Sequence, residues 1–333
     1  MASRAVPGEF DLIERYFKRP ARRARLGVGD DCALIAPEAG MELAISTDML
    51  AEGTHFLAGT NAQRLGHKTL AVNLSDLAAM GAAPRYATLA LALPSADEIW
   101  LAAFARGFFA LADAHGVELI GGDTTRGPLN LCVTVLGEVP AGRAIRRSGA
   151  QPDDDIWVSG TLGDAALGLA HLKGEVKLSV DASDYAVARL EMPLPRIELG
   201  IALRATASAM IDLSDGLAGD LGQIARACGL GARLEVDSLP LAALLAAQWA
   251  DMPPPERRRL TAAGGDDYEL CFTAAPAQRA QVQAAGVQAG VRVTRIGSMT
   301  GPRGAAGAVL VVDANGNPCL PTVSGYDHFK DMA

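Results

Sequence analysis

Acidic residues gather with glycine, serine or threonine at six points of the chain, each at the edge of an apolar segment. Carboxylate, hydroxyl and carbonyl oxygens are hard ligands of the kind that Mg²⁺ prefers, and the neighbouring glycines let a ligand approach the backbone closely. One such aspartate alone is most often a helix N-cap or a turn residue. Six such motifs together favour a site for Mg²⁺ and phosphate. The alternative is that they are turns of a glycine-rich α/β protein. The motifs are Gly29-Asp30-Asp31, Ser46-Thr47-Asp48, Ser75-Asp76, Gly121-Gly122-Asp123-Thr124-Thr125, Asp212 with Ser214-Asp215-Gly216, and Gly264-Gly265-Asp266-Asp267.

The sequence lacks the motifs of several common phosphate-binding and catalytic scaffolds. It contains no G-x-x-x-x-G-K-[ST] motif of P-loop enzymes, and no G-x-G-x-x-G opens a helix after a predicted strand. It also lacks G-x-S-x-G and the protein-kinase pair of H-R-D and D-F-G. If this chain binds ATP, it therefore uses a different scaffold.

Composition and charge restrict the class of protein further. Of the 333 residues, 50% are hydrophobic and 20% are charged, so the chain can bury a core and is unlike a disordered protein. The formal net charge of -8 disfavours a nucleic-acid partner, and it repels phosphate ligands unless cations intervene. Neither a signal peptide nor an uncharged apolar stretch of about 18 residues occurs. The five scattered cysteines indicate thiols in a reducing compartment. We therefore expect a cytoplasmic protein with no membrane partner.

Apolar periodicity predicts a first half of mixed helices and strands. Residues 9–17, 64–80 and 96–115 have the helical spacing of apolar side chains, and Gly116 is a suitable stop for the third helix. Strands are predicted at 33–36, 42–46, 85–93, 118–120 and 129–138.

A segment rich in Gly, Pro, Arg and Asp at 139–155 is predicted to connect two domains, as the chain length also suggests. Beyond it, strands and helices alternate, which is typical of a layered α/β domain. Residues 253–255, with three prolines, are predicted to form a surface loop. Strands are predicted at 156–159, 209–213, 233–236, 268–273, 291–296 and 309–312, and helices at 164–171 and 217–228. We therefore expect an α/β fold of two domains, residues 1–140 and 150–333.

Nine segments between residues 8 and 329 closely resemble the thiamine-monophosphate kinases, a family of the aminoimidazole-ribonucleotide-synthetase-like ATP-binding superfamily. A single short motif such as GGD is weak evidence for a family, but the nine segments in this order are specific to this one. The segments are GEFDLIERYF, GVGDDCALI, STDMLAEGTHF, NLSDLAAMGAAPRYATLALALP, LIGGDTTRGPL, RSGAQPDDDIWVSGTLGDAALGL, MIDLSDGLAGDLG, GGDDYELCF and GYDHF.

The resemblance implies an enzyme of thiamine diphosphate biosynthesis. It would transfer the γ-phosphoryl group of ATP directly to thiamine monophosphate with Mg²⁺. The implied fold has an N-terminal domain that binds ATP and Mg²⁺ and whose mixed sheet forms a shared barrel in a homodimer. A layered α/β C-terminal domain would complete the active site.

The resemblance also assigns roles to positions of this chain, as a hypothesis. Because the acceptor phosphate is already ionised, no single residue is expected to act as an essential base, and catalysis would come from positioning and charge neutralisation. The implied ligands of several Mg²⁺ ions are Asp30, Ser46, Thr47, Asp48, Asp76, Asp123, Asp212 and Asp215. The implied ATP contacts are Gly121, Gly122, Arg147 and Ser214, and the implied thiamine monophosphate contacts are His55, Asp266 and Tyr326. The resemblance also implies an aromatic contact to adenine in the helix around residues 108–109.

One departure and two alternatives accompany this hypothesis. The family often has glutamate at the position of Asp266, whose shorter side chain keeps the negative charge but has a shorter reach toward the substrate. A sister enzyme, such as aminoimidazole ribonucleotide synthetase, is disfavoured by the GTHF and GGDDYELCF matches. A non-catalytic nucleotide sensor is disfavoured by the intact set of acidic residues.

Overall fold

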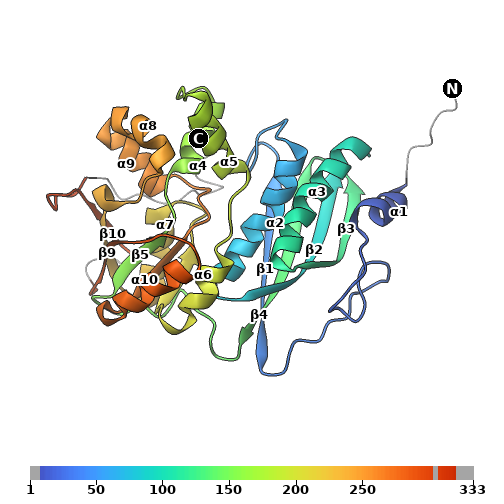
Figure 1. Cartoon of the computed structure of the whole chain (residues 1–333), viewed down its shortest axis with the longest axis horizontal. Helices are drawn as coiled ribbons and strands as arrows, with labels where there is room; N and C mark the ends of the chain where they lie inside the picture. Colours follow the sequence, from blue (N-terminus) through green and yellow to red (C-terminus); the bar gives the residue numbers. More distant parts are fainter. Residues whose placement is uncertain (1–7, 303–306, 320–333) are drawn as a thin grey trace. The chain divides into compact units, whose positions relative to one another are not determined.

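The chain folds into two compact α/β units. The computed structural model (Figure 1) describes residues 8–302 and 307–319. One unit comprises residues 1–77 and 82–142, and the other comprises residues 78–81 and 143–333. Each unit has one mixed sheet with helices, so the expected fold class is confirmed. Within the described residues, no helix is long and apolar enough to cross a membrane.

The first unit is built on a four-stranded sheet with the strand order β1-β4-β2-β3. β4 is antiparallel to both of its neighbours, and β2 is parallel to β3, with a helix connecting them. The strand order places β1 and β3 at the two opposite edges. The strands are β1 (Met41–Ala51), β2 (Ala83–Leu93), β3 (Glu118–Arg126) and β4 (Asn130–Pro140), and the helical segments are α1 (Glu9–Leu12), the π-helical turn η1 (Ile13–Phe17), α2 (Ala62–Ala79) and α3 (Glu98–His115).

Helices α2 and α3 lie side by side over one face of this sheet (Figure 1). Their backbones approach closely at two glycines: a Cβ on Gly66 would lie 2.0 Å from the Phe104 carbonyl oxygen, and one on Gly107 would lie 1.7 Å from that of Gln63. Any larger residue there would push the helices apart. Asp97 caps the start of α3 by accepting two backbone hydrogen bonds, and Gly116 ends it in a left-handed conformation, as the sequence predicts.

The other face of β1 carries exposed apolar side chains. Successive side chains of a strand alternate between the two faces of a sheet. Ile45 and Met49 are 61% and 55% exposed, whereas Leu50 is 3% exposed. An apolar surface in the middle of a strand is unusual for an isolated sheet and marks a candidate interface.

The second unit contains a six-stranded sheet with the order β10-β7-β9-β5-β8-β6. β10 and β7 are parallel, and the other neighbours are antiparallel. The strands are β5 (Asp155–Ser159), β6 (Ala209–Asp212), β7 (Gly231–Glu235), β8 (Leu270–Ala274), β9 (Val293–Thr300) and β10 (Val309–Val312). The α-helices are α4 (Asp164–Leu172), α5 (Val180–Glu191), α6 (Ile197–Ala202), α7 (Leu217–Cys228), α8 (Ala246–Asp251), α9 (Pro254–Ala263) and α10 (Arg279–Gln288), and the 3₁₀ turns are η2 (Leu203–Ala205), η3 (Val236–Ser238), η4 (Ala243–Leu245) and η5 (Pro276–Gln278).

Two apolar cores stabilise this unit. Helix α7 packs its buried side, with Leu221 and Ile224, against the sheet residues Val158 and Leu234. A second core beside α4 and α5 surrounds Trp249, which is 1% exposed. Because α7 follows β6 directly, the loop between them is held at one end of the sheet.

Two predictions of local structure are wrong, and one helix was not predicted. Residues 33–36 form no strand, because Leu34 makes only an isolated bridge to Leu26. Residues 253–255 form no loop: Pro254 begins α9, where its missing N–H is tolerated in the first turn. Helix α5, which we did not predict, begins at the capping residue Ser179.

Candidate functional site

One group of predicted site residues lies where β1 meets α2. The Ser46 hydroxyl donates to the Asp76 carboxylate, with 2.5 Å between Oγ and Oδ2. The backbone N–H of Asp48 donates to Oδ1 of Asn73, also on α2, at 2.9 Å. β1 and α2 therefore bring Ser46, Asp48 and Asp76 together, as predicted for a shared site.

Thr47 and His55 occupy different positions near this group. Strand alternation turns the Thr47 side chain to the opposite face from Ser46 and Asp48, where its hydroxyl lies 2.8 Å from that of Thr134. His55 lies in the turn after β1, and its Nδ1 accepts the backbone N–H of Ala51 at 3.0 Å. Lys68 of α2 donates to the His55 carbonyl oxygen at 3.2 Å, which fixes the turn against that helix.

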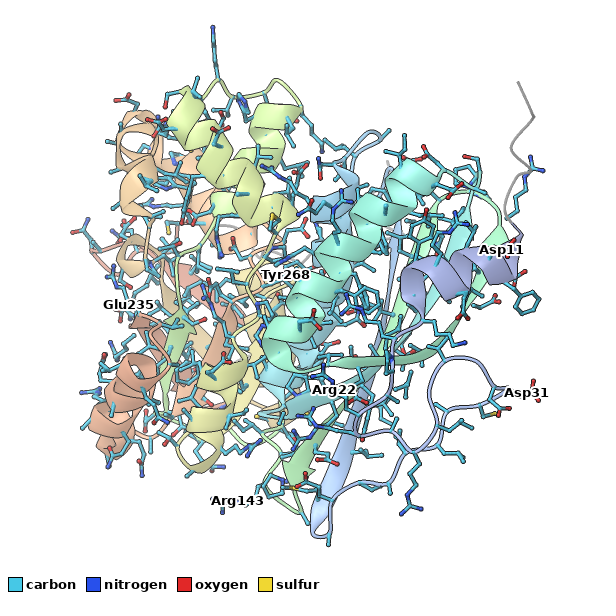
Figure 2. All side chains as sticks on the ribbon, turned by 45° about the vertical axis from the view of Figure 1, so that its right-hand side comes forward. Asp11, Arg22, Asp31, Arg143, Glu235 and Tyr268 are labelled. Carbon is cyan, nitrogen blue, oxygen red and sulfur yellow. The ribbon has the colours of Figure 1, made fainter. Side chains whose placement is uncertain are left out.

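A second group surrounds a cavity of about 580 Å³ beside the edge strand β3. Its polar wall includes Asp30 on the loop of residues 28–33, together with Gly121, Gly122 and Asp123 on β3. Its apolar wall comes from α1, η1 and β2, including Phe10. In Figure 2, Asp11 marks α1 and Asp31 marks the loop. The fold thus brings Asp30 to the same cavity as three consecutive residues of β3 that lie about 90 positions later in the chain.

The two glycines in this cavity wall differ in their surroundings. Gly122 has φ of +154°, and a Cβ there would lie 1.9 Å from the Leu89 carbonyl oxygen. A Cβ on Gly121 would meet only the Thr88 Cγ2, at 3.8 Å. Gly122 is therefore required by the close approach of β2 and β3, whereas nothing within the unit requires glycine at position 121.

One residue of the cavity wall is not among the predicted site residues, and two aromatic residues near the expected adenine contact are buried. Lys18 lines the cavity and pairs with Glu14 at 2.7 Å; the basic run that begins at Arg15 was a signal for it. The aromatic contact expected around residues 108–109 cannot come from Phe108 or Phe109, because both side chains lie in the core.

A third group is held in the second unit by two loops that run together. Asp212 ends β6, and Ser214 and Asp215 follow it before α7. The carbonyl oxygen of Ser214 accepts the backbone N–H of Asp266 at 2.9 Å. The acidic motifs around residues 212–215 and 264–267 are therefore neighbours, although they are about 50 positions apart in the sequence.

Mutual repulsion is strong in this third group. Asp220, on the first turn of α7, is 4% exposed and accepts the backbone N–H of Asp215 at 3.1 Å. Burial, and then the charges of Asp215 and Asp212, raise the pKa of Asp220 to about 8. Asp220 is not among the predicted site residues, although an aspartate inside the apolar run of a helix is a signal visible in the sequence.

Arg147 lies apart from the third group. The Arg147 carbonyl oxygen accepts the Cys228 thiol at 3.4 Å, at the C-terminal end of α7, whereas Ser214 precedes its N-terminal end. A helix of 12 residues is about 18 Å long, so the backbones of Arg147 and Ser214 lie far apart. Tyr326 lies outside the described residues.

The first two groups cannot hold one metal ion within a single chain. β1 and β3 are separated by three strand spacings of about 4.8 Å, or about 14 Å. Two carboxylates on one Mg²⁺ lie within about 4 Å of each other, because each Mg–O bond is about 2.1 Å. In agreement, the described residues contain no group of three or more His, Cys, Asp or Glu side chains placed to hold a metal. The donors nevertheless fit Mg²⁺ chemically, since they are crowded oxygen ligands whose repulsion a cation would relieve.

Comparison with known proteins gives matches over nearly the whole chain. Residues 29–139 match the AIR synthase related protein N-terminal domain, and residues 151–309 match the corresponding C-terminal domain. The thiamine-monophosphate kinase of Salmonella typhimurium is 49% identical over 327 residues, which cover 97% of this chain and 98% of that protein.

Solved structures agree with these matches. The crystal structure of thiamine-monophosphate kinase from Stenotrophomonas maltophilia superposes with a TM-score of 0.81 at 46% identity, covering 92% of this chain and 95% of that one. A structure described as AaThiL complexed with AMPPCP and TMP superposes with a TM-score of 0.74 at 28% identity, covering 88% and 89%.

Proposed function

We propose that this chain phosphorylates thiamine monophosphate with ATP. The premise is that it belongs to the AIR synthase related family and, within that family, to the thiamine-monophosphate kinases. The products would be thiamine diphosphate and ADP. The observation in the fold that supports this best is the cavity that joins Asp30, Gly121, Gly122 and Asp123. Its volume lies within the range of about 300–1,000 Å³ that small-molecule sites have.

The lining of the cavity suggests an orientation for ATP. The apolar wall, with Phe10, suits the base. The backbone of Gly121 and Gly122 on β3 suits the phosphates, because glycine has no side chain to keep a ligand away from the backbone. Lys18 adds a positive charge to the cavity lining, whose other charged residues are all acidic. We assign Gly121 and Gly122 to ATP on this basis, and we keep Ser214 and Arg147 as further ATP contacts.

Donor and acceptor are both anions, and the chain carries a net charge of -8. Two unit charges at 4 Å repel by about 4 kcal/mol at an effective dielectric constant of 20. Mg²⁺ would supply the positive charge that offsets this repulsion. The residues that would hold several such ions are Asp30, Ser46, Thr47, Asp48, Asp76, Asp123, Asp212 and Asp215.

The contribution of the chain itself is to orient the two substrates. The phosphate of thiamine monophosphate is already ionised, so the transfer needs no protein base and depends on in-line alignment. His55 and Asp266 would hold the acceptor, and Tyr326 would complete that contact. Residues 1–140 would bind ATP and Mg²⁺, and residues 150–333 would complete the site. We place this reaction in the cytoplasm.

The separation of about 14 Å between the sheet edges suggests that two copies of the chain share each site. In a homodimer that joins the exposed faces around Ile45 and Met49 into a barrel, the β1 edge of one copy would approach the β3 edge of the other. Asp48 of one copy and Asp123 of its partner could then serve one reaction.

Mixing two inactive variants tests this shared site. Asp48→Asn and Asp123→Asn are each expected to abolish turnover. Random pairing after joint refolding makes about half of the dimers mixed, and each mixed dimer has one intact site, so about a quarter of the wild-type activity returns. If each site belongs to one chain, every site in the mixture carries a substitution and no activity returns.

The activity is tested by incubating the protein with ATP, Mg²⁺ and thiamine monophosphate and separating the products by chromatography. Thiamine diphosphate should form, and it should disappear with EDTA and with Asp48→Asn. A protein that binds ATP but forms no thiamine diphosphate would refute the proposed function.

A further inference from the structure

A cluster of buried charged side chains lies next to the acidic loop of residues 264–267 in the second unit. Glu269, immediately before β8, is fully buried. Its carboxylate accepts hydrogen bonds from Arg189 of α5 at 2.8 Å, from Nε of Arg196 at 2.7 Å, and from the Ser159 hydroxyl at 2.6 Å. Three separate segments thus meet at one side chain of the GGDDYEL motif.

The same cluster extends along the motif to Asp267. Both carboxylate oxygens of Asp267 accept the backbone N–H of Gly163, at 3.1 and 3.0 Å, just before α4. Arg189 also donates to the Asp267 carbonyl oxygen at 3.4 Å. The loop is therefore anchored at two alternate residues, and Asp266 lies directly beside the first.

Glycines allow these segments to approach one another. A Cβ on Gly160, which has φ of +60°, would lie 2.1 Å from the Glu269 carboxylate. A Cβ on Gly265 would lie 2.6 Å from the Ser214 carbonyl oxygen. The contacts leave no space for side chains, so the loop has little freedom to shift relative to the neighbouring loop of residues 213–216.

The anchored loop is strained. Asp266 and Tyr268 have φ of +67° and +48°, a region that non-glycine residues seldom occupy. Their backbone N–H groups donate to the carbonyl oxygens of Ser214 and Leu213, at 2.9 and 2.8 Å. Such a conformation persists only where its surroundings impose it. Within this loop, the buried anchors on both sides of Tyr268 are Asp267 and Glu269.

We infer that Glu269, clamped by Arg189 and Arg196, is a positioning residue that imposes this strained loop and thereby sets Asp266 beside Asp215. Because Glu269 is fully buried, it acts on the site through the loop. The assignment of Asp266 to thiamine monophosphate rests on the proposed function, whereas the mechanical role of the cluster rests on the contacts above.

Two substitutions weaken the contacts between Glu269 and the two arginines in different ways. Glu269→Gln keeps the shape but removes the charge, and Arg196→Lys keeps the charge but loses the two-pronged contact of the guanidinium. Hydrogen exchange should become faster at the amides of Asp266 and Tyr268 in both variants. The Kd for thiamine monophosphate, measured by calorimetry without ATP, should rise about tenfold or more, since a small misplacement of a binding group is costly.

A matched control separates positioning from general stability. Arg258 on α9 makes a similar two-pronged contact with Asp237 in the same unit, at 3.0 and 2.8 Å, and this contact involves neither Asp267 nor Glu269. Arg258→Lys should leave both the exchange and the Kd unchanged. If Glu269→Gln does not fold, Arg196→Lys carries the test alone.

The outcomes are distinct. Native exchange at Asp266 and Tyr268 in folded Arg196→Lys, with an unchanged Kd, would overturn the inference. A lower Tm with an unchanged Kd of the folded protein would also overturn it, because it would show a structural role only. A wild type that neither binds nor phosphorylates thiamine monophosphate would overturn the proposed function instead, and the exchange measurement would still decide the role of the clamp.

Discussion

Replacing the two adjacent glycines of β3 by alanine should give opposite results. The Cβ of Gly122→Ala would lie 1.9 Å from the Leu89 carbonyl oxygen, whereas real contacts of this kind are essentially never shorter than 3.0 Å. Either β2 or β3 must therefore move by about 1 Å, which weakens the ladder between them. Overpacking of this kind costs about 1–3 kcal/mol, and each lost ladder hydrogen bond costs about 1 kcal/mol more.

We therefore expect Gly122→Ala to lose about 2–4 kcal/mol of unfolding free energy in the first unit. Gly121→Ala should keep the stability of the wild type, because its Cβ meets only Thr88 Cγ2 at 3.8 Å. If ATP phosphates approach the backbone at Gly121, the added methyl group should raise the KM for ATP while the Tm stays the same.

Urea unfolding followed by circular dichroism, together with initial rates at varied ATP, measures both effects. A fall of 2–4 kcal/mol corresponds to a Tm lower by about 5–15 °C. A Gly122→Ala protein as stable as the wild type would refute the packing argument. A Gly121→Ala protein with an unchanged KM for ATP would refute the placement of ATP phosphates at this wall.

Three further predictions address stability, assembly and the metal. Hydrogen bonds from Arg279 and Arg295 hold the pKa of Asp155 below its usual value. The stability that this carboxylate contributes is therefore present above the pKa of about 3.9 that it has when unfolded, and it is lost as the pH falls through the lower folded value. Asp155→Asn should flatten the acid limb of the curve of unfolding free energy against pH; an identical limb would contradict this. Ile45→Asp places a charge on the exposed sheet face and should convert a dimer to a monomer in equilibrium sedimentation, and a stable dimeric variant would exclude that face as the interface. Asp215→Asn should raise the Mg²⁺ concentration that gives half-maximal rate, and an unchanged Mg²⁺ dependence would remove Asp215 from the metal set.

Local signals in the sequence were sufficient for most elements. The apolar spacing before Gly116 predicts α3, and the periodicity at 217–228 predicts α7 with the same bounds. The same reasoning failed at Pro254, because a proline begins a helix as readily as it occupies a loop. It also missed α5, whose buried side consists of two alanines, Arg189 and Leu190, so that few large apolar side chains mark its helical spacing.

The grouping of the candidate site depends on long-range pairing that no local pattern encodes. The acidic motifs are visible in the sequence, but only the strand order shows that Asp48 and Asp123 belong to opposite sheet edges. Likewise, Arg189 and Arg196 reach Glu269 from about 75 positions away, so periodicity could not link them. Strand alternation could have separated Thr47 from Ser46 once β1 was predicted.

Phosphorus-31 NMR of one reaction mixture tests the central claim most directly. The protein would be mixed with ATP, Mg²⁺ and thiamine monophosphate, and the phosphorus signals would be followed in time. Direct phosphoryl transfer predicts that thiamine diphosphate and ADP appear in equal amounts and that no inorganic phosphate is released. Formation of ADP and inorganic phosphate without thiamine diphosphate would contradict the account and would place the chain among enzymes that use ATP for another chemistry.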